Sequence, residues 1–351
     1  MANSERTGGI IDLRGDWAAP PTDEMRSAMA AAEVGDDNSG EDPTVRELEE
    51  MAAGMFGREA GLFVPSGTMG NLVSVLALTC HGDEIIVGDA AHTFVYEVGG
   101  AAVIGGHPFR TVANDRFGMM SPVEVRAAIR PENIHFPRTG LLLLENTHNL
   151  RGGAVLTQDQ MASLVDIVHE HDIPVHLDGS RIFNAAAFLN QPVDDLTADV
   201  DTLTFCLSKA LAAPVGSLVV GDRETMRAAR QARKLLGGGM RQAGVIAAAG
   251  IVALEQMVER LPEDHEVASR LAESLAEMPG LRVDVEATQT NLVFVDTTGP
   301  VGAGEICARL ESEGIRVNQF TESRFRLATH YCVDVADAER VIDVMQDILA
   351  A

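Results

Sequence analysis

An acid and an amine that each follow a predicted strand are the most informative side chains in the sequence. Asp178 follows the strand predicted over Pro174–Leu177, and Lys209 lies just past the strand predicted over Asp201–Cys206. Because α/β sheets bind ligands outside the carboxyl ends of their strands, both side chains are expected at one site. Pyridoxal phosphate needs a lysine amine for its covalent attachment and a carboxylate against its pyridine nitrogen, so this pair suits that cofactor.

Each of the two residues also has a plainer interpretation. The sequence holds two lysines, and Lys234, in RQARKLLGG, is the one competitor of Lys209 for the cofactor. Lys234 falls on a predicted exposed helix face, where a solvated charge is the ordinary case. Asp178 could instead cap the helix predicted over Ser180–Ala187. From spacing alone, these alternatives stay open.

A third candidate is the turn Pro65–Asn71, with the sequence PSGTMGN. It leads from a strand into a helix, and its small residues let backbone amides approach an anion at the positive end of that helix. A plain strand-to-helix turn with a threonine cap is the alternative. Together with Lys209 and Asp178, the turn is the expected phosphate site, with Ser66, Gly67 and Thr68 closest to the anion.

Residues 43–261 carry the pattern of a parallel α/β sheet, because short β-branched or leucine-rich runs alternate there with longer helical segments. One such helix is expected over Gln158–His171, where apolar residues recur at helical spacing. The predicted strands are Gly61–Pro65, Glu84–Gly88, Gly140–Glu145, Pro174–Leu177, Asp201–Cys206 and Gly216–Gly221.

The pattern changes on both sides of this region. Residues 262–351 read as a smaller α+β domain, with strands near Leu281–Val285, Thr290–Val295, Ile315–Asn318 and Phe325–Ala328. Residues 1–42 are loop-rich and acidic, and we expect them to form an arm that packs elsewhere on the chain or against a partner subunit.

The amino-acid composition limits which partners and which cellular compartment are expected for this protein. The net charge of −25 disfavours nucleic acid or a membrane surface as a partner. Acid excess with only two lysines favours a protein that works at high salt, against the alternative of a GC-rich genome that prefers arginine codons. The four cysteines lack ligand-like spacing and are expected to be reduced core residues in a cytoplasmic protein. MANSERTGGI does not resemble a secretion signal, and no apolar run is long enough for a membrane span.

Ten segments in a fixed order resemble the threonine aldolase family of fold-type I pyridoxal-phosphate enzymes. They run from about Ile10 to His330 and are IIDLRGDW, GDDNSGEDPTVRELE, PSGTMGN, AAHTFVYEVGGAA, NIHFPRTGLLLLENTHN, HLDGSRIFNA, LSKALAAPVGS, GGGMRQ, QTNLVFVD and RFRLATH. The resemblance implies a large α/β domain with a mainly parallel seven-stranded sheet, a smaller α+β C-terminal domain, and a homo-oligomer that is at least a dimer and is expected to be a tetramer.

Carried over position by position, the resemblance assigns roles in cofactor binding. It makes Lys209 the residue that binds pyridoxal phosphate covalently and Asp178 the partner of the pyridine nitrogen. His92, in AAHTF, would stack on the cofactor ring, and Arg241, in GGGMRQ, would reach a cofactor phosphate, which could be that of a neighbouring subunit.

The resemblance also assigns substrate contacts. Arg181 and Arg326 would bind the substrate carboxylate, which suits the planar guanidinium fork. His135, in NIHFP, resembles a family histidine near the substrate β-hydroxyl, although it could equally be a turn histidine that caps a strand. The base that takes the β-hydroxyl proton would be His92, which is slightly favoured, His135 or a bound water.

The sequence departs from the family at three positions. Gly15 replaces a serine whose hydroxyl normally helps to hold the substrate carboxylate, and Trp17 replaces a small threonine. Ser39 stands where the family has a tyrosine. Each lost hydroxyl should weaken a contact by roughly 1 kcal/mol if nothing compensates, which affects substrate preference and efficiency.

The activity that the resemblance implies is retro-aldol cleavage of threonine or allo-threonine, to glycine and acetaldehyde. Trp17 keeps open another pyridoxal lyase of the same fold, such as a phenylserine-type aldolase or a β-eliminating enzyme. A catalytically weak, cofactor-binding scaffold is the alternative from a different class.

Overall fold

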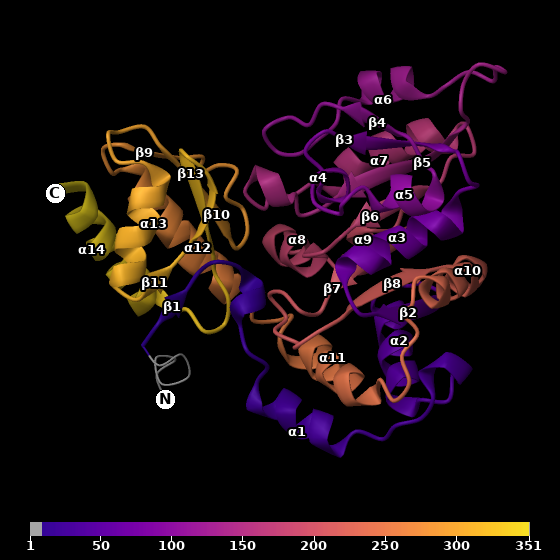
Figure 1. The fold of residues 1–351 in the computed structure, drawn as a ribbon, viewed down its shortest axis with the longest axis horizontal. Helices are drawn as coiled ribbons and strands as arrows, with labels where there is room; N and C mark the ends of the chain where they lie inside the picture. Colours follow the sequence, from indigo (N-terminus) through magenta and orange to yellow (C-terminus); the bar gives the residue numbers. More distant parts are fainter. Residues whose placement is uncertain (1–8, 351) are drawn as a thin grey trace.

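The computed structural model describes residues 9–350 and has a large α/β part and a smaller α+β part side by side (Figure 1). One hydrophobic core reaches from Ala19 to Leu261, and a separate one joins Ile11 and Leu13 to residues between Val267 and Ile348. On this basis we propose a division of the chain at 261/262.

A seven-stranded sheet forms the centre of the large part, in the order β2-β8-β7-β6-β5-β3-β4. Only β8 runs against the others, so the sheet is mainly parallel, as expected. Its strands are β2 (Ala60–Val64), β3 (Glu84–Gly88), β4 (Phe109–Val112), β5 (Thr139–Glu145), β6 (Val175–Asp178), β7 (Thr202–Cys206) and β8 (Ser217–Gly221). The predicted strands are confirmed to within a residue at each end, whereas β4 was missed.

Helices cover both faces of this sheet (Figure 1). They are α2 (Pro43–Met55), α3 (Gly67–Leu78), α4 (His92–Val95), α5 (Gly100–Gly105), α6 (Pro122–Ala128), α7 (Gln158–His169), α8 (Ile182–Leu189), α9 (Val193–Leu196), α10 (Arg223–Leu235) and α11 (Gly244–Gln256). The helix predicted over Gln158–His171 is confirmed as α7. It begins at a capping box in which Thr157 and Gln160 satisfy each other's backbone donors, and it buries Met161, Leu164 and Val168.

The N-terminal segment is more regular than the loop-rich arm that was expected. It contains β1 (Ile11–Asp12), a 3-10 helix over Asp16–Ala18, α1 (Asp23–Ala31) and a second 3-10 helix over Asp37–Ser39. Strand β1 pairs with the small part, and α1 packs on α11 of the large part. The segment therefore spans both parts of this chain. Residues 1–8, which hold most of the stretch tested for a secretion signal, lie outside the described range.

The small part is built on a four-stranded antiparallel sheet in the order β12-β13-β10-β9. Its elements are α12 (Leu261–Ala276), β9 (Leu281–Val283), β10 (Leu292–Thr297), α13 (Ala303–Ser312), β11 (Ile315–Arg316), β12 (Asn318–Thr321), β13 (Arg324–Ala328) and α14 (Val335–Ala350). The single strand expected over Ile315–Asn318 was wrong, because the chain changes sheet there. Strand β11 pairs with β1, and β12 pairs with β13.

No disulfide bond joins any of the four cysteines. The expectation that they are core residues was wrong for Cys80, which is exposed after α3, and Cys307 is only partly buried. Between residues 9 and 350, no helix combines the length and the apolar character that a membrane crossing requires.

Candidate active site

A cavity of about 400 Å³ opens where the carboxyl ends of the central strands meet the small part and the N-terminal segment. This is the edge of the sheet at which α/β proteins bind ligands. The residues that line it are Trp17, His92, Tyr96, Asn149, Arg181, Lys209, Asn318, Gln319, Phe320 and Arg326. Three parts of the chain that lie far apart in sequence therefore build one pocket.

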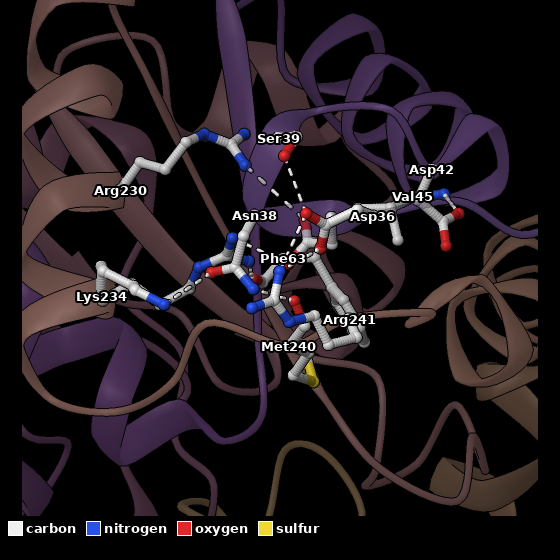
Figure 2. Close-up of polar contacts among 12 residues, drawn as sticks. Asp36, Asn38, Ser39, Asp42, Val45, Phe63, Arg230, Lys234, Met240 and Arg241 are labelled. Atoms are coloured by element: carbon white, nitrogen blue, oxygen red, sulfur yellow. Dashed lines mark hydrogen bonds and ion pairs between the residues drawn. The ribbon is translucent and has the colours of Figure 1, made fainter.

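Lys209 is the lysine of this cavity. It follows β7, whose parallel neighbour β6 ends at Asp178, so the two predicted residues meet at the same edge of the sheet. Lys234 lies elsewhere, exposed near the end of α10, with its amine 3.3 Å from Asn38 Oδ1 (Figure 2). The structure thus separates the two lysines as the sequence had suggested.

Asp178 is buried and does not cap a helix. Its Oδ1 accepts hydrogen bonds from the backbone N–H and the hydroxyl of Ser180 at 3.1 and 2.8 Å, and its Oδ2 accepts one from Asn71 Nδ2 at 3.0 Å. Helix α8 begins at Ile182, with Arg181 in the capping position. The alternative reading of Asp178 as a helix cap was therefore wrong.

The charge of Asp178 fits a partner for a protonated ring nitrogen. Burial by itself would raise its pKa, but the positive charges of His92 and Lys209 and the bond from Ser180 outweigh burial and hold the pKa below its usual range. The carboxylate is thus ionised in a buried setting. Such a group favours a cationic partner, as the pyridine nitrogen of the cofactor is when protonated.

His92 begins α4 and lies against two acids. Its Nδ1 is 3.0 Å from Glu97 Oε1, and its backbone N–H donates to Glu145 Oε2 at 2.6 Å. Glu97 also accepts a bond from Asn71 at 2.8 Å. Burial would lower the pKa of His92, but Glu97 and the charge of Asp178 raise it above its usual value. Asn71, which contacts both Glu97 and Asp178, connects the three groups.

The predicted anion turn adopts the expected form. Ser66 caps α3, and its hydroxyl accepts a bond from the backbone N–H of Met69 at 3.2 Å. Gly67 and Thr68 form the first turn of this helix of 12 residues. A Cβ on Gly67 would lie 2.9 Å from Cys206 Sγ, so glycine is what lets the turn pack against the end of β7. The free amides of this turn are suited to a phosphate.

Arg181 is buried and bound to an acid that the sequence had not singled out. Its Nε and Nη2 donate to the two carboxylate oxygens of Asp16 at 2.6 and 2.8 Å. Asp16 also accepts a bond from Asn291 Nδ2 at 3.0 Å. Two of the guanidinium nitrogens of Arg181 are thereby committed within the protein, which leaves Nη1 for a ligand.

Arg326, on β13, lines the same cavity and also has two of its three guanidinium nitrogens bound within the protein. Its Nη1 donates to Asn149 Oδ1 at 3.0 Å and its Nη2 to the Arg14 carbonyl at 3.3 Å, while its buried Nε has no partner within residues 9–350. Burial, and then the charge of Arg181, lowers the pKa of Arg326 to about 10. Two cations that repel each other across a cavity favour an anion between them.

Three other predicted site residues are placed differently. Arg241 is exposed and pairs with Asp36 at 3.0 Å, away from the cavity of its own chain (Figure 2). His135 is exposed in the loop before β5, at the amino edge of the sheet, so this chain does not bring it to the pocket. Gly15 borders the cavity through Trp17, whose ring lies against it.

Several residues of the site were not predicted from the sequence. Asp16 is a buried acid whose partners are distant in sequence, so no spacing pattern marks it. Glu97 is also a buried acid, and its place only five residues after His92 is the signal that could have pointed to it. Asn71 was noticed only as the end of the anion turn. The remaining ones, which line the cavity, are Tyr96, Asn149, Asn318, Gln319 and Phe320.

Comparison with known proteins agrees with this geometry. The family described as Beta-eliminating lyase matches residues 12–298. The chain is 44% identical over 345 residues to low-specificity L-threonine aldolase 1 of Arabidopsis thaliana, across 97% of this chain and 96% of that protein. It is 42% identical over 321 residues to the low specificity L-threonine aldolase of Escherichia coli K12, across 92% and 94%.

The fold of this chain is also similar to that of a solved structure. The threonine aldolase of Leishmania major superposes with a TM-score of 0.82 at 17% identity, across 97% of this chain and 99% of that one. The predicted fold-type I α/β architecture is thereby confirmed.

Proposed function

The chain belongs to the Beta-eliminating lyase family, and from this premise we propose that it is a pyridoxal-phosphate-dependent threonine aldolase. It cleaves L-threonine and L-allo-threonine to glycine and acetaldehyde. The observation that carries the proposal is the convergence of Lys209, His92 and the two arginines on one cavity, with the Asp178 carboxylate ionised beside them. The near full-length likeness to low-specificity L-threonine aldolases supports the reaction.

The residues present fit the cofactor. Lys209 would supply the amine that binds its aldehyde, Asp178 would keep its ring nitrogen protonated, and the turn of Ser66, Gly67 and Thr68 would hold its phosphate. When bound, pyridoxal phosphate withdraws electrons from the substrate bond that breaks at Cα. Lys209 lines the cavity close enough to Asp178 for its charge to lower the pKa of that carboxyl.

Arg326 and Arg181 bind the substrate carboxylate in this proposal. Arg326 lines the cavity with a guanidinium that no acid among the described residues neutralises, and Arg181 adds the charge that Asp16 holds in place. By fixing the carboxylate, the two arginines orient the bonds at Cα, so that the Cα–Cβ bond is the one that breaks.

His92 takes the proton of the β-hydroxyl. It lines the cavity, and its Nδ1 is held by Glu97, so its Nε2 is the nitrogen left for substrate. His135 was the alternative base, and its exposed place at the amino edge of the sheet favours His92.

We also propose that the protein is a cytoplasmic homo-oligomer, at least a dimer and in full a tetramer. A group of exposed apolar side chains on α4, on α5 and on the connection between them supports an interface: Phe94, Val95, Tyr96, Val98, Val103 and Ile104. Arg241, which lies away from its own cavity, would then reach the phosphate site of a neighbouring subunit. Four cysteines without a disulfide bond between them support the reducing compartment.

Product analysis tests the reaction. The holoenzyme, purified in high salt, is incubated with L-threonine and L-allo-threonine, and glycine, acetaldehyde, pyruvate and ammonia are measured. Glycine and acetaldehyde in equal amounts are expected. Pyruvate and ammonia would point to β-elimination instead, and absence of all four products would point to a scaffold.

A further inference from the structure

The two unusual residues of the N-terminal segment, Gly15 and Trp17, are in direct contact. A Cβ built on Gly15 would lie 2.0 Å from Trp17 Nε1 and 2.6 Å from its Cδ1 and Cε2. The pyrrole edge of the indole therefore occupies the space that any side chain at position 15 would need. The two substitutions are one structural change, in which a glycine makes room for the indole nitrogen.

This segment is fixed between the two arginines of the cavity. The carbonyl of Arg14 accepts a bond from Arg326 Nη2 at 3.3 Å, and the carboxylate of Asp16 binds Arg181 at 2.6 and 2.8 Å. Gly15 lies between these two anchors, and Trp17 follows directly and lines the cavity. The indole is consequently a neighbour of both groups that would hold a carboxylate.

The ring is held in place but its N–H is unused. The guanidinium of Arg14 stands 5.6 Å from the ring centroid, and Asp12 holds that guanidinium at 2.9 and 2.6 Å. Within the described part of the chain, the indole N–H has no hydrogen-bond partner, and 54% of the Trp17 surface is exposed. An indole nitrogen is a donor only, so its partner must be an acceptor, and a carboxylate oxygen is a strong one.

We propose that the indole N–H of Trp17 donates a hydrogen bond to the substrate carboxylate, in place of the hydroxyl that Gly15 lacks. The inference rests on the proposed function, because it assumes an amino-acid substrate between Arg181 and Arg326. It also explains why Gly15 accompanies Trp17, since the nitrogen takes the place of a side chain at position 15.

Binding of glycine to the holoenzyme tests the inference without turnover. W17F keeps a flat ring and removes the donor, so the Kd for glycine, followed by the visible absorbance of the bound cofactor, should rise about tenfold, the usual effect of losing one hydrogen bond to a charged group. Methylamine has the amine but no carboxylate, and its Kd should not change. G15S/W17T, which supplies a hydroxyl instead, should bind glycine within about threefold of wild type.

G15A provides a matched variant that leaves Trp17 in the chain. Its Cβ must displace the indole, so it too should weaken glycine binding about tenfold. Trp17 is the only tryptophan, so a change in intrinsic fluorescence of G15A reports on its displacement alone. Because both changes remove the same bond, G15A/W17F should bind glycine no more weakly than either single variant.

Two outcomes would overturn the inference: a W17F variant that binds glycine as wild type does, or losses in G15A and W17F that add in the double variant. A weakening of methylamine binding equal to that of glycine would also contradict it, since the ring would then act on the cofactor. Failure of the proposed function looks different, because the wild-type holoenzyme would then release no glycine from threonine.

Discussion

The charge on His92 depends on the acid beside it. Glu97 Oε1 lies 3.0 Å from Nδ1 of His92, and the two groups share a hydrogen bond. Burial raises the pKa of the Glu97 carboxyl above its usual value, although the bond to His92 partly offsets this rise. His92 must be neutral to take a proton from the β-hydroxyl. Glu97 is thus a positioning residue that also sets the pH above which His92 is neutral and can accept a proton.

Replacing Glu97 by glutamine should extend activity to lower pH. The cleavage rate falls as pH drops below the pKa of His92, because the imidazole becomes protonated. Glu97 raises that pKa, so it moves the acid limb of the rate profile to higher pH, and E97Q should move it back to lower pH. The profile of kcat/KM against pH measures this. A limb that stays in place, or moves to higher pH, would show that His92 is not the base.

His92→Phe should retain the cofactor and lose most cleavage. A phenyl ring can still stack but cannot accept a proton, so kcat should fall by about 10²–10⁴-fold, the usual contribution of a general base. The visible absorbance of the cofactor is the control for binding. Unchanged rates would transfer the role to His135 or to a bound water.

At the scale of single residues, the sequence could show which side chains stand at strand ends but not which groups contact them. Lys209 and Asp178 were found because residue type and strand position coincide. Asp16 was missed because its partners come from elements that only folding brings together, whereas Glu97 was missed although it lies five residues after His92. The wrong cap reading of Asp178 has the same origin, since Asn71 and Ser180 take its oxygens.

The N-terminal segment is joined to the site by buried hydrogen bonds. Asp16 joins it to Arg181, next to α8, and to Asn291, at the start of β10. Burial would raise the pKa of Asp16, but Arg181 holds it well below its usual range, so this ion pair persists at any moderate pH. The pair is buried on both sides, with side-chain exposures of 5% and 0%.

Asp16→Asn should therefore destabilise the fold by about 3–5 kcal/mol, because it leaves the charge of Arg181 buried without a partner. Asp12→Asn is the matched control. It breaks the partly exposed pair with Arg14, which should contribute about 0–1 kcal/mol. Urea unfolding gives both values, and a D16N loss no larger than that of D12N would contradict the role of this ion pair.

The elements that the sequence predicted well are those buried on both faces. All residues of β5 and β7 are buried, and their apolar runs gave their bounds to within a residue. The edge strand β4, with the sequence FRTV, has only one fully buried residue, so it lacks the apolar run that marks the central strands. The split of β11 from β12 could not be predicted, because it depends on pairing with β1 at the other end of the chain.

The net charge of −25 affects the stability of the protein as a whole. Carboxylates repel one another across the surface at low salt, and this repulsion opposes the compact state. Raising KCl from about 0.1 M to about 1 M shortens the screening length from about 10 Å to about 3 Å.

The free energy of unfolding should consequently rise with KCl over that range. Thermal or urea unfolding at several KCl concentrations measures it, with glycerol of equal osmolarity as a control for effects that do not depend on charge. A constant or falling free energy would remove the proposal that this protein is adapted to high salt.

Lys209 should hold the cofactor covalently, and because the sequence has two lysines, the position of attachment can be assigned directly. The holoenzyme is reduced with borohydride, digested, and analysed by mass spectrometry, with K209A as the control. The cofactor mass should appear on the peptide that contains Lys209, and K209A should lack both the visible absorbance and turnover. Attachment at Lys234, or a K209A variant with full activity, would show that Lys209 does not hold the cofactor.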